Sequence, residues 1–172
     1  MAVTINVFNG VTYTLAAYGA LQKTNTNGTE TRCPFFVTLR SVDVSTFNAA
    51  DSDFLRDRFS GGIYTTTGLN ELATANGYTK GGKTLTNARF TYASGALTFT
   101  ADAVRWAASG TGIVAKSALL CYQGAEAIYN NDIYYTSVPI AMIDFDMTAT
   151  VGAGQSLTLN WPAAGIFKWQ LA

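Results

Sequence analysis

Apolar and polar residues alternate with a period of two along most of this chain, and this period is typical of β-strands. Val3, Ile5 and Val7 alternate with polar residues, and the Asn9-Gly10 pair that follows favours a tight hairpin turn. The next segment, VTYTLAAYGAL, continues the alternation, so an opening hairpin is predicted. A polar stretch, QKTNTNGTETR, then separates this hairpin from the apolar strand PFFVTLRSV.

Further strand-like segments follow in the second half of the chain, separated by turn residues. They are LTNARFTY, ALTFTADAVRW, IVAKSALLCYQG, VPIAMIDFDMTA, SLTLNWP and GIFKWQL, with the turn PAAG between the last two. Phe90 and Tyr92, and then Leu97 and Phe99, alternate around the turn ASGA as antiparallel strands do. Short strands roughly every ten residues predict a mainly β domain, an antiparallel β-sandwich or a jelly-roll-like arrangement, rather than an α/β fold.

The alternation fails in residues 45–75. In STFNAADSDFLRDRF, serine and aspartate residues can cap helices, and Phe54, Leu55 and Phe59 recur at nearly helical spacing. We therefore expect one or two short helices in this region, which reads as a long excursion between sheets.

The composition limits the domain count and the partners. A chain of 172 residues is long enough for one well-buried domain and short for two, so we expect a single domain over residues 1–172. Eleven basic side chains balance eleven acidic ones, and only 13% of the residues are charged, so no net field favours nucleic acid or an anionic membrane. With 48% apolar residues and so few charges, part of the surface is expected to be covered by other subunits.

The first residues resemble a strand and not a targeting segment. After Met1, the segment AVTINVFNGV has no basic region, no continuous apolar core and no small-residue cleavage site, so no signal peptide is expected. No apolar run approaches the length of a membrane span. We expect synthesis in the cytoplasm.

The residues that usually carry enzyme chemistry are sparse. Histidine is absent, which removes the usual general base of hydrolases and the commonest transition-metal ligand. The two cysteines, Cys33 and Cys121, form no C-x-x-C motif and are expected to be buried thiols that behave as small apolar groups. An acidic cluster that begins at Asp51 lacks the glycine and the glutamate that a calcium loop requires. We therefore assign no catalytic, cofactor-binding or metal-binding residue.

Asp144 and Asp146 are two residues apart in the segment IDFD and would lie on the same face of a strand. A paired carboxylate site is conceivable there. Such a pair more often marks the solvent face of a half-buried strand, so we expect Ile143 and Phe145 to point inward.

The segment 77–84 matches the pattern G-x-x-x-x-G-K-[ST] of a phosphate-binding loop. Such a loop lies between a buried strand and a helix N-terminus, where backbone N–H groups cradle the phosphates. Here the preceding segment LNELATAN is polar, and the residues that follow alternate as β-strands do. We therefore interpret the glycines as turn residues that need positive φ, with both lysines in solvent. These residues are Gly77, Gly81 and Gly82, and Lys80 and Lys83.

Distinctive segments follow one another along nearly the whole chain. They are AVTINVFNGV, FFVTL, AADSDFLRD, NELATANGYTKGGKTLTN, FTADAVRWAAS, a strand leading to LLCYQG, PIAMIDFD and LTLNWPAAGIF. In this order they resemble a family of small virion structural proteins of tailed bacteriophages, and the most specific pieces are GYTKGGKTL, ADAVRWAAS and LTLNWPAAGIF. In that family the positions of Lys80 and Lys83 need not be lysine, which agrees with a structural turn. The resemblance implies a virion component without enzymatic activity, although QKTNTNGTETR and the long segment INVFNGVTYTLAAYGAL depart from it.

Three positions suit such a protein. The first hypothesis is a capsid decoration or cement protein, a β-domain on the outer shell whose partners are the major capsid protein and sister copies, with a trimer favoured. The second is a component of the tail or of a fibre, including an adaptor. The third, from another class, is a carbohydrate-binding module, because three tryptophans and nine tyrosines could supply stacking platforms. Trp106, Trp161 and Trp169 lie in or beside predicted strands, however, and core positions are the simpler expectation.

Contact residues are predicted in three places: an N-terminal hairpin or arm over residues 1–32, the acidic helical stretch, and the polar turn NND. They are Phe8, Tyr13 and Tyr18 in the arm, Arg56 and Arg58 in the stretch, and Tyr134 and Tyr135 beside the turn. A rigid, amphipathic tyrosine ring at a loop tip is a good interface anchor. Packing of Tyr129 and Tyr134 on a neighbouring strand is an equally open alternative.

Overall fold

The structure is a computed structural model, and it describes residues 4–7, 35–43, 71–123, 127–129, 132–134 and 137–170. All of the regular secondary structure in these residues is β-strand. The bounds are β1 Thr4–Val7, β2 Phe35–Arg40, β3 Lys83–Thr84, β4 Arg89–Ala93, β5 Ala96–Thr100, β6 Val104–Ala107, β7 Ile113–Gln123, β8 Ala127–Tyr129, β9 Asp132–Tyr134, β10 Ser137–Val151, β11 Ser156–Leu159 and β12 Phe167–Gln170.

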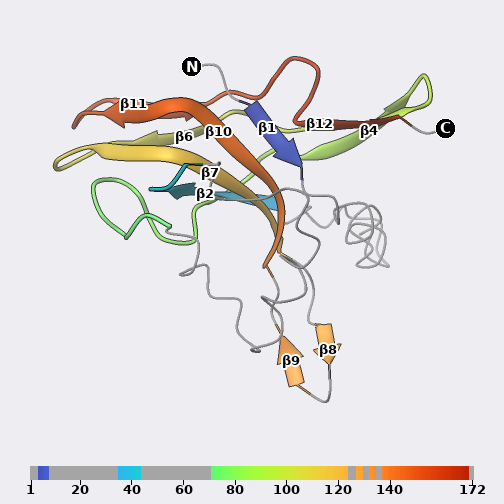
Figure 1. Ribbon diagram of the computed structural model, residues 1–172, viewed down its shortest axis with the longest axis horizontal. Helices are drawn as coiled ribbons and strands as arrows, with labels where there is room; N and C mark the ends of the chain where they lie inside the picture. The colour runs from blue at the N-terminus through green and yellow to red at the C-terminus, as the bar shows by residue number, and fades with distance from the viewer. Residues whose placement is uncertain are drawn as a thin grey trace.

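All of the strand pairs are antiparallel, so the predicted mainly β, antiparallel class is confirmed. One sheet has the order β1-β10-β7-β2-β3, and a second has the order β12-β5-β4. β11 pairs with β6, and β8 pairs with β9. In Figure 1 the β8–β9 hairpin lies well apart from the other sheets.

The long strands β7 and β10 form the centre of the five-stranded sheet. Their pairing runs from Ser137 opposite Gln123 to Val151 opposite Ile113 and contains two register shifts. β2 pairs with the other edge of β7, and β1 pairs with β10. The predicted opening strand is therefore present as β1, and it pairs with a C-terminal strand. Its expected hairpin partner after Asn9 lies outside the described residues.

Both faces of the central sheet are buried in its middle part. On β7, Ala118 and Leu120 lie on one face and Leu119 and Cys121 on the other, and all four are 0% exposed. The continuous apolar run SALLCY is consistent with this, because strands buried on both faces do not alternate. The predicted sandwich or jelly roll is not confirmed by the described strands.

Four phenylalanine rings connect the two larger sheets. Phe99 on β5 lies at the centre, with its ring centroid 4.5 Å from Phe35 on β2, 4.7 Å from Phe90 on β4 and 4.9 Å from Phe167 on β12. Rings at such separations attract one another beyond the effect of their burial. Phe35 and Phe99 are fully buried, so this cluster holds the three-stranded sheet against β2.

The predicted strand ALTFTADAVRW is in fact two strands, β5 and β6, separated by residues 101–103. The predicted final pair forms as β11 and β12, and the PAAG turn between them is closed by the Gly165 N–H, which donates to Pro162 O at 2.9 Å. However, β11 pairs with β6 and β12 pairs with β5. Both chain segments therefore pass from one sheet to the other together, at 101–103 and at 160–166.

The predicted short helices are not seen. Residues 45–70 of that region lie outside the described residues. In the part that is described, Glu71 forms an isolated β-bridge with Arg40, and Ala75 forms one with Tyr78. The Asn76-Gly77 turn follows directly, and its positive φ angles would end any helix at this point.

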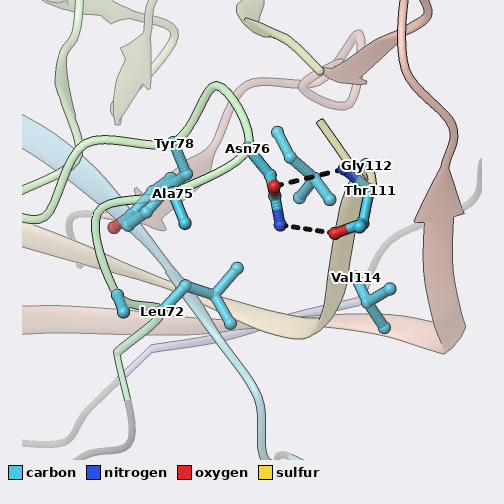
Figure 2. Close-up of a pocket in the computed structure, with 9 residues that line it drawn as sticks. Leu72, Ala75, Asn76, Tyr78, Thr111, Gly112 and Val114 are labelled. Atoms are coloured by element: carbon cyan, nitrogen blue, oxygen red, sulfur yellow. Dashed lines mark hydrogen bonds between the residues drawn. The ribbon is translucent and has the colours of Figure 1, made fainter. Parts of the chain in front are cut away.

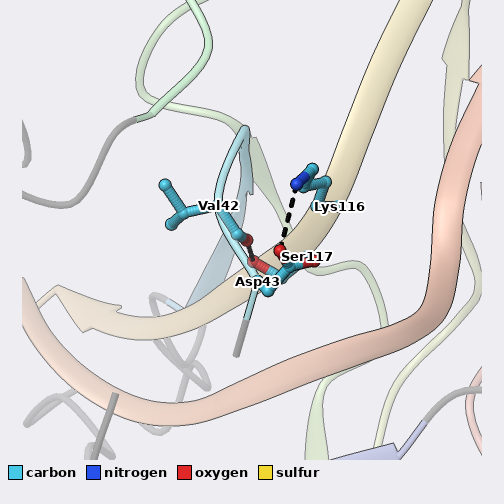
Figure 3. Close-up of polar contacts among 4 residues, drawn as sticks. All are labelled: Val42, Asp43, Lys116 and Ser117. Atoms are coloured by element: carbon cyan, nitrogen blue, oxygen red, sulfur yellow. Dashed lines mark hydrogen bonds and ion pairs between the residues drawn. The ribbon is translucent and has the colours of Figure 1, made fainter. Parts of the chain in front are cut away.

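The end of β2 is joined to β7 by side chains (Figure 3). The Ser117 hydroxyl donates to Val42 O at 2.7 Å. Lys116 Nζ lies 3.0 Å from Asp43 Oδ2, and both side chains are largely exposed. Such a surface ion pair contributes at most about 1 kcal/mol, so the buried hydroxyl is the more important link.

Candidate functional site

The glycine-rich motif begins with a two-residue turn at Asn76 and Gly77. Ala75 and Tyr78 exchange two backbone hydrogen bonds of 3.0 and 2.8 Å, and the two residues between them have φ of 54° and 89°. Positive φ at both positions is the mark of a type I′ turn, for which Asn-Gly is the preferred sequence. A Cβ atom at Gly77 would also collide with the Ala107 carbonyl oxygen of β6. Glycine is therefore required here by the fold.

The second half of the motif is also a turn. Gly81 and Gly82 have φ of 97° and 72°, and the Gly82 N–H donates to Thr79 O at 3.1 Å. The chain then continues as β3, which pairs with β2, where a phosphate loop would require a helix. The interpretation of these glycines as turn residues is confirmed. Lys80 and Lys83 are exposed as predicted, and Lys83 Nζ donates to Arg105 O at 2.7 Å.

Tyr78 joins this loop to the sheet. Its hydroxyl donates to Glu71 Oε1 at 2.6 Å and accepts from the Leu39 N–H of β2 at 3.1 Å. The same carboxylate oxygen accepts from the Gly81 N–H at 2.6 Å. Burial, and then the hydrogen bond to Glu71, raise the pKa of Tyr78 well above its ordinary value. The hydroxyl thus stays protonated and acts as a clamp, a role that the sequence did not reveal.

Cys121 is a buried thiol, as expected. It is 0% exposed, and burial raises the pKa of its thiol from 9.0 to about 12. A thiol that stays protonated is a poor nucleophile and metal ligand. Cys33 lies outside the described residues.

Asp102 joins two of the three most specific segments of the sequence to the residues that directly follow the third. Its Oδ2 accepts from Asn87 Nδ2 at 2.7 Å and from the Thr86 hydroxyl at 3.2 Å, and its N–H donates to Thr86 O at 3.0 Å. Its carbonyl oxygen accepts from Trp161 Nε1 at 2.8 Å. Asp102 belongs to ADAVRWAAS, its partners Thr86 and Asn87 immediately follow GYTKGGKTL, and Trp161 belongs to LTLNWPAAGIF. Segments far apart in the sequence therefore form one hydrogen-bonded framework at the site where both strand pairs change sheet.

A pocket of about 290 Å³ lies between the glycine-rich loop and the start of β7 (Figure 2). Its polar groups bond to each other or to the protein: Asn76 Nδ2 donates to the Thr111 hydroxyl at 2.9 Å, and the Thr111 N–H donates to Asn76 Oδ1 at 3.2 Å. The Tyr78 hydroxyl is used by Glu71 and Leu39. Each polar side chain that lines this pocket therefore already makes a hydrogen bond within the protein.

A second pocket, of about 250 Å³, lies beside the Asp102 framework. Its lining residues are Thr100, Ala101, Ala103, Asn160, Trp161, Pro162 and Gly165. None of these side chains carries a charge. Trp161 is the only aromatic residue among them.

The aspartate pair of β10 has a structural function. Ile143 and Phe145 are buried, as predicted. Asp146 has φ of 57°, and its N–H donates to Asp144 Oδ1 at 2.9 Å. The pair thus lies at the register shift that follows Asp144, where the strand is irregular, and one carboxylate holds the backbone of the other residue.

Most of the predicted contact residues lie outside the described residues. These are Phe8, Tyr13, Tyr18, Arg56, Arg58 and Tyr135, and of Tyr134 only the backbone, in β9, is described. On either side of the predicted polar turn, Tyr129 of β8 pairs with Asp132 of β9, while Asn130 and Asn131 lie outside the described residues. The structure thus provides a hairpin at this position without testing its contacts.

The tryptophans have different environments. Trp106 is 1% exposed and belongs to the core, so it cannot be a stacking platform. Trp161 is half-buried, and the side chain of Trp169 is not described.

In the described part of the chain, no helix is long and apolar enough to cross a membrane, and no three acidic or cysteine side chains gather as a metal site requires. No protein-family model matches the chain, and neither a curated protein nor a solved structure is significantly similar to it. The described residues therefore form an antiparallel β protein, in which the motif that matches a phosphate-binding loop is a structural turn.

Proposed function

We propose that this chain is a structural protein of a tailed-phage virion, and that it decorates the outer shell of the head. The proposal rests on the order of sequence segments that resembles this family. Its mechanism would be mechanical: identical domains bridge capsid subunits, and shell symmetry makes many weak contacts additive. Its partners would be the major capsid protein and sister copies, with a trimer as the favoured assembly.

The structural observation that supports this proposal is the framework around Asp102. The segments with the strongest resemblance supply hydrogen-bond partners for one another, and Gly77 is required by its neighbour on β6. The residue types found in these segments are therefore explained by their role in stabilising the fold. The segment 77–84, which matches the pattern of a phosphate-binding loop, also serves to build the fold. This supports a structural role over that of a phosphate-transfer enzyme.

The proposal includes a β-sandwich or jelly-roll-like arrangement of the complete domain. The four-phenylalanine cluster between β2 and the sheet of β4, β5 and β12 supports two packed sheets. Such compact β-domains suit repeated attachment to a shell.

The β8–β9 hairpin is the proposed contact element, because it lies apart from the sheets (Figure 1). Tyr134 is the last residue of β9, and Tyr135 follows it. Replacing both by Ala should weaken particle binding at least about tenfold, as the loss of an interface hot spot does, with an unchanged unfolding temperature. Tyr92→Ala is the matched control, since this tyrosine is 64% exposed on another hairpin. Equal effects of the two variants would contradict the assignment.

The experiment that tests the function is co-sedimentation of the purified protein with tail-less phage capsids that lack it. Mass spectrometry then gives its ratio to the major capsid protein. Saturable binding at a fixed ratio to that protein is expected. Absence from shells together with a low copy number in isolated tails would overturn the decoration role and favour the tail or a fibre.

A further inference from the structure

The pocket of about 250 Å³ beside Trp161 lies where β5 passes into β6 and β11 passes into β12. Thr100 ends β5, and Ala101 and Ala103 belong to the first break. Asn160, Trp161 and Gly165 belong to the second break. Because both strand pairs separate at the same place, the sheets leave a depression between them that short loops do not fill.

The indole in this pocket is held in one orientation. Trp161 Nε1 donates to Asp102 O at 2.8 Å, and the ring also packs against the core. Asp102 is itself held by Asn87 and Thr86. An aromatic ring that is fixed by a second layer of hydrogen bonds is preorganised, so a ligand would not have to order it on binding.

Two polar side chains of this pocket are unused, in contrast to those of the pocket at Asn76. The exposed side chain of Asn160 makes no hydrogen bond with the described residues. Thr100 Oγ1 is buried and likewise has no hydrogen-bond partner. Buried hydroxyl groups are rarely left in this state, and rotation about the Cα–Cβ bond would turn the hydroxyl of a pocket-lining threonine toward a ligand.

We infer that this pocket binds a neutral sugar unit of a glycan, a binding activity beyond the proposed virion role. The C–H groups of the sugar ring would pack on the indole, whose π-system is electron-rich. The Asn160 amide has a donor and an acceptor side by side and suits neighbouring sugar hydroxyls, and the Thr100 hydroxyl completes the set. A proline-rich peptide is disfavoured because it needs a groove lined by several aromatic rings, and this pocket has one.

The test is a titration of protein with ¹⁵N-labelled tryptophan, in which each indole N–H gives its own NMR signal. The probes are the methyl glycosides of glucose, galactose, mannose and N-acetylglucosamine, and Trp161→Phe assigns the signal. A saturable shift of the Trp161 signal is expected with at least one of these sugars. No saturable shift with any of the four, or a shift only with a proline-rich peptide, would overturn the inference.

Two variants distinguish the pocket from nonspecific contact. Asn160→Ala removes an exposed side chain and should weaken sugar binding about tenfold, the effect of one good hydrogen bond. Thr100→Val keeps the shape of the side chain, removes a hydroxyl without a partner, and should weaken binding severalfold with no loss of thermal stability. Thr91→Val, on the exposed strand β4, is the control and should leave the affinity unchanged. Unchanged affinity in Asn160→Ala refutes the site even if another variant fails to fold.

Discussion

Tyr78→Phe tests whether the clamp between the glycine-rich loop and β2 holds the fold. The change keeps the ring, which is 2% exposed, and removes only the hydroxyl. Two hydrogen bonds are lost: the one to Glu71 Oε1 at 2.6 Å and the one from the Leu39 N–H at 3.1 Å. The Leu39 N–H is then buried without an acceptor.

The magnitude follows from these two losses. A hydrogen bond to a charged group contributes about 1.5–3 kcal/mol, and a stranded buried donor costs about 1–3 kcal/mol. The two terms overlap, because both describe the removal of one hydroxyl. We therefore expect the free energy of unfolding to fall by about 2–4 kcal/mol, which lowers the unfolding temperature by about 5–15 °C for a domain of this size.

Urea denaturation of the two proteins measures the difference, and amide hydrogen exchange at Leu39 tests its cause. Exchange at this amide should become faster in Tyr78→Phe. Tyr92→Phe is the matched control, because this hydroxyl is on a side chain that is 64% exposed, and its effect should stay within about 0.5 kcal/mol. A Tyr78→Phe variant as stable as the wild type, with Leu39 still protected, would refute the reasoning.

Three further predictions concern pH, glycine and the indole. Folding raises the pKa of Cys121 from 9.0 to about 12 and that of Tyr78 above 10.0, so both groups hold their protons more tightly when folded. The stability that these two protonated groups contribute should be fully present below about pH 9 and be lost as the pH rises through their pKa values in the folded protein. In Cys121→Ala only Tyr78 contributes, so the urea midpoint should stay constant up to about pH 10. Gly77→Ala should cost about 1–3 kcal/mol more than Gly81→Ala, because only the first Cβ meets a backbone carbonyl while both positions have positive φ; equal thermal shifts would exclude the collision as the cause. Trp161→Phe should lower the free energy of unfolding by about 1–2 kcal/mol through the lost indole hydrogen bond and some packing, and an unchanged chemical denaturation curve would show that this bond is not needed.

Much of the strand content could be predicted from the residues. The alternation around ASGA predicted β4 and β5, and Ser94 and Gly95 indeed have φ of 49° and 73° between them. The Asn76-Gly77 turn was also predictable, because few dipeptides accept positive φ at both positions. The helices were predicted from the near-helical spacing of Phe54, Leu55 and Phe59, which lie outside the described residues. In the part of that region that is described, residues 71–75, no helix is seen.

The candidate site was beyond the reach of the sequence. Asp102 lies in the middle of a segment predicted as one strand, and nothing in its neighbours indicates that Thr86, Asn87 and Trp161 would bond to it. Tyr78 and Glu71 were likewise not selected as partners. These contacts join residues as many as 59 positions apart, and local patterns carry no information on such pairs.

By itself, the sequence determined the β class, the sites of most turns and the burial of Ile143, Phe145 and Cys121, because these depend on local periodicity and on the conformations each residue accepts. Only the tertiary structure decided which strands pair, so that β11 joins β6 and β12 joins β5. It also decided that the middle of the central sheet is buried on both faces, and that the Trp161 pocket forms where two strand pairs separate. The physical reason is that pairing and packing are chosen by the total burial and hydrogen bonding of the whole chain, and many local patterns are compatible with more than one such choice.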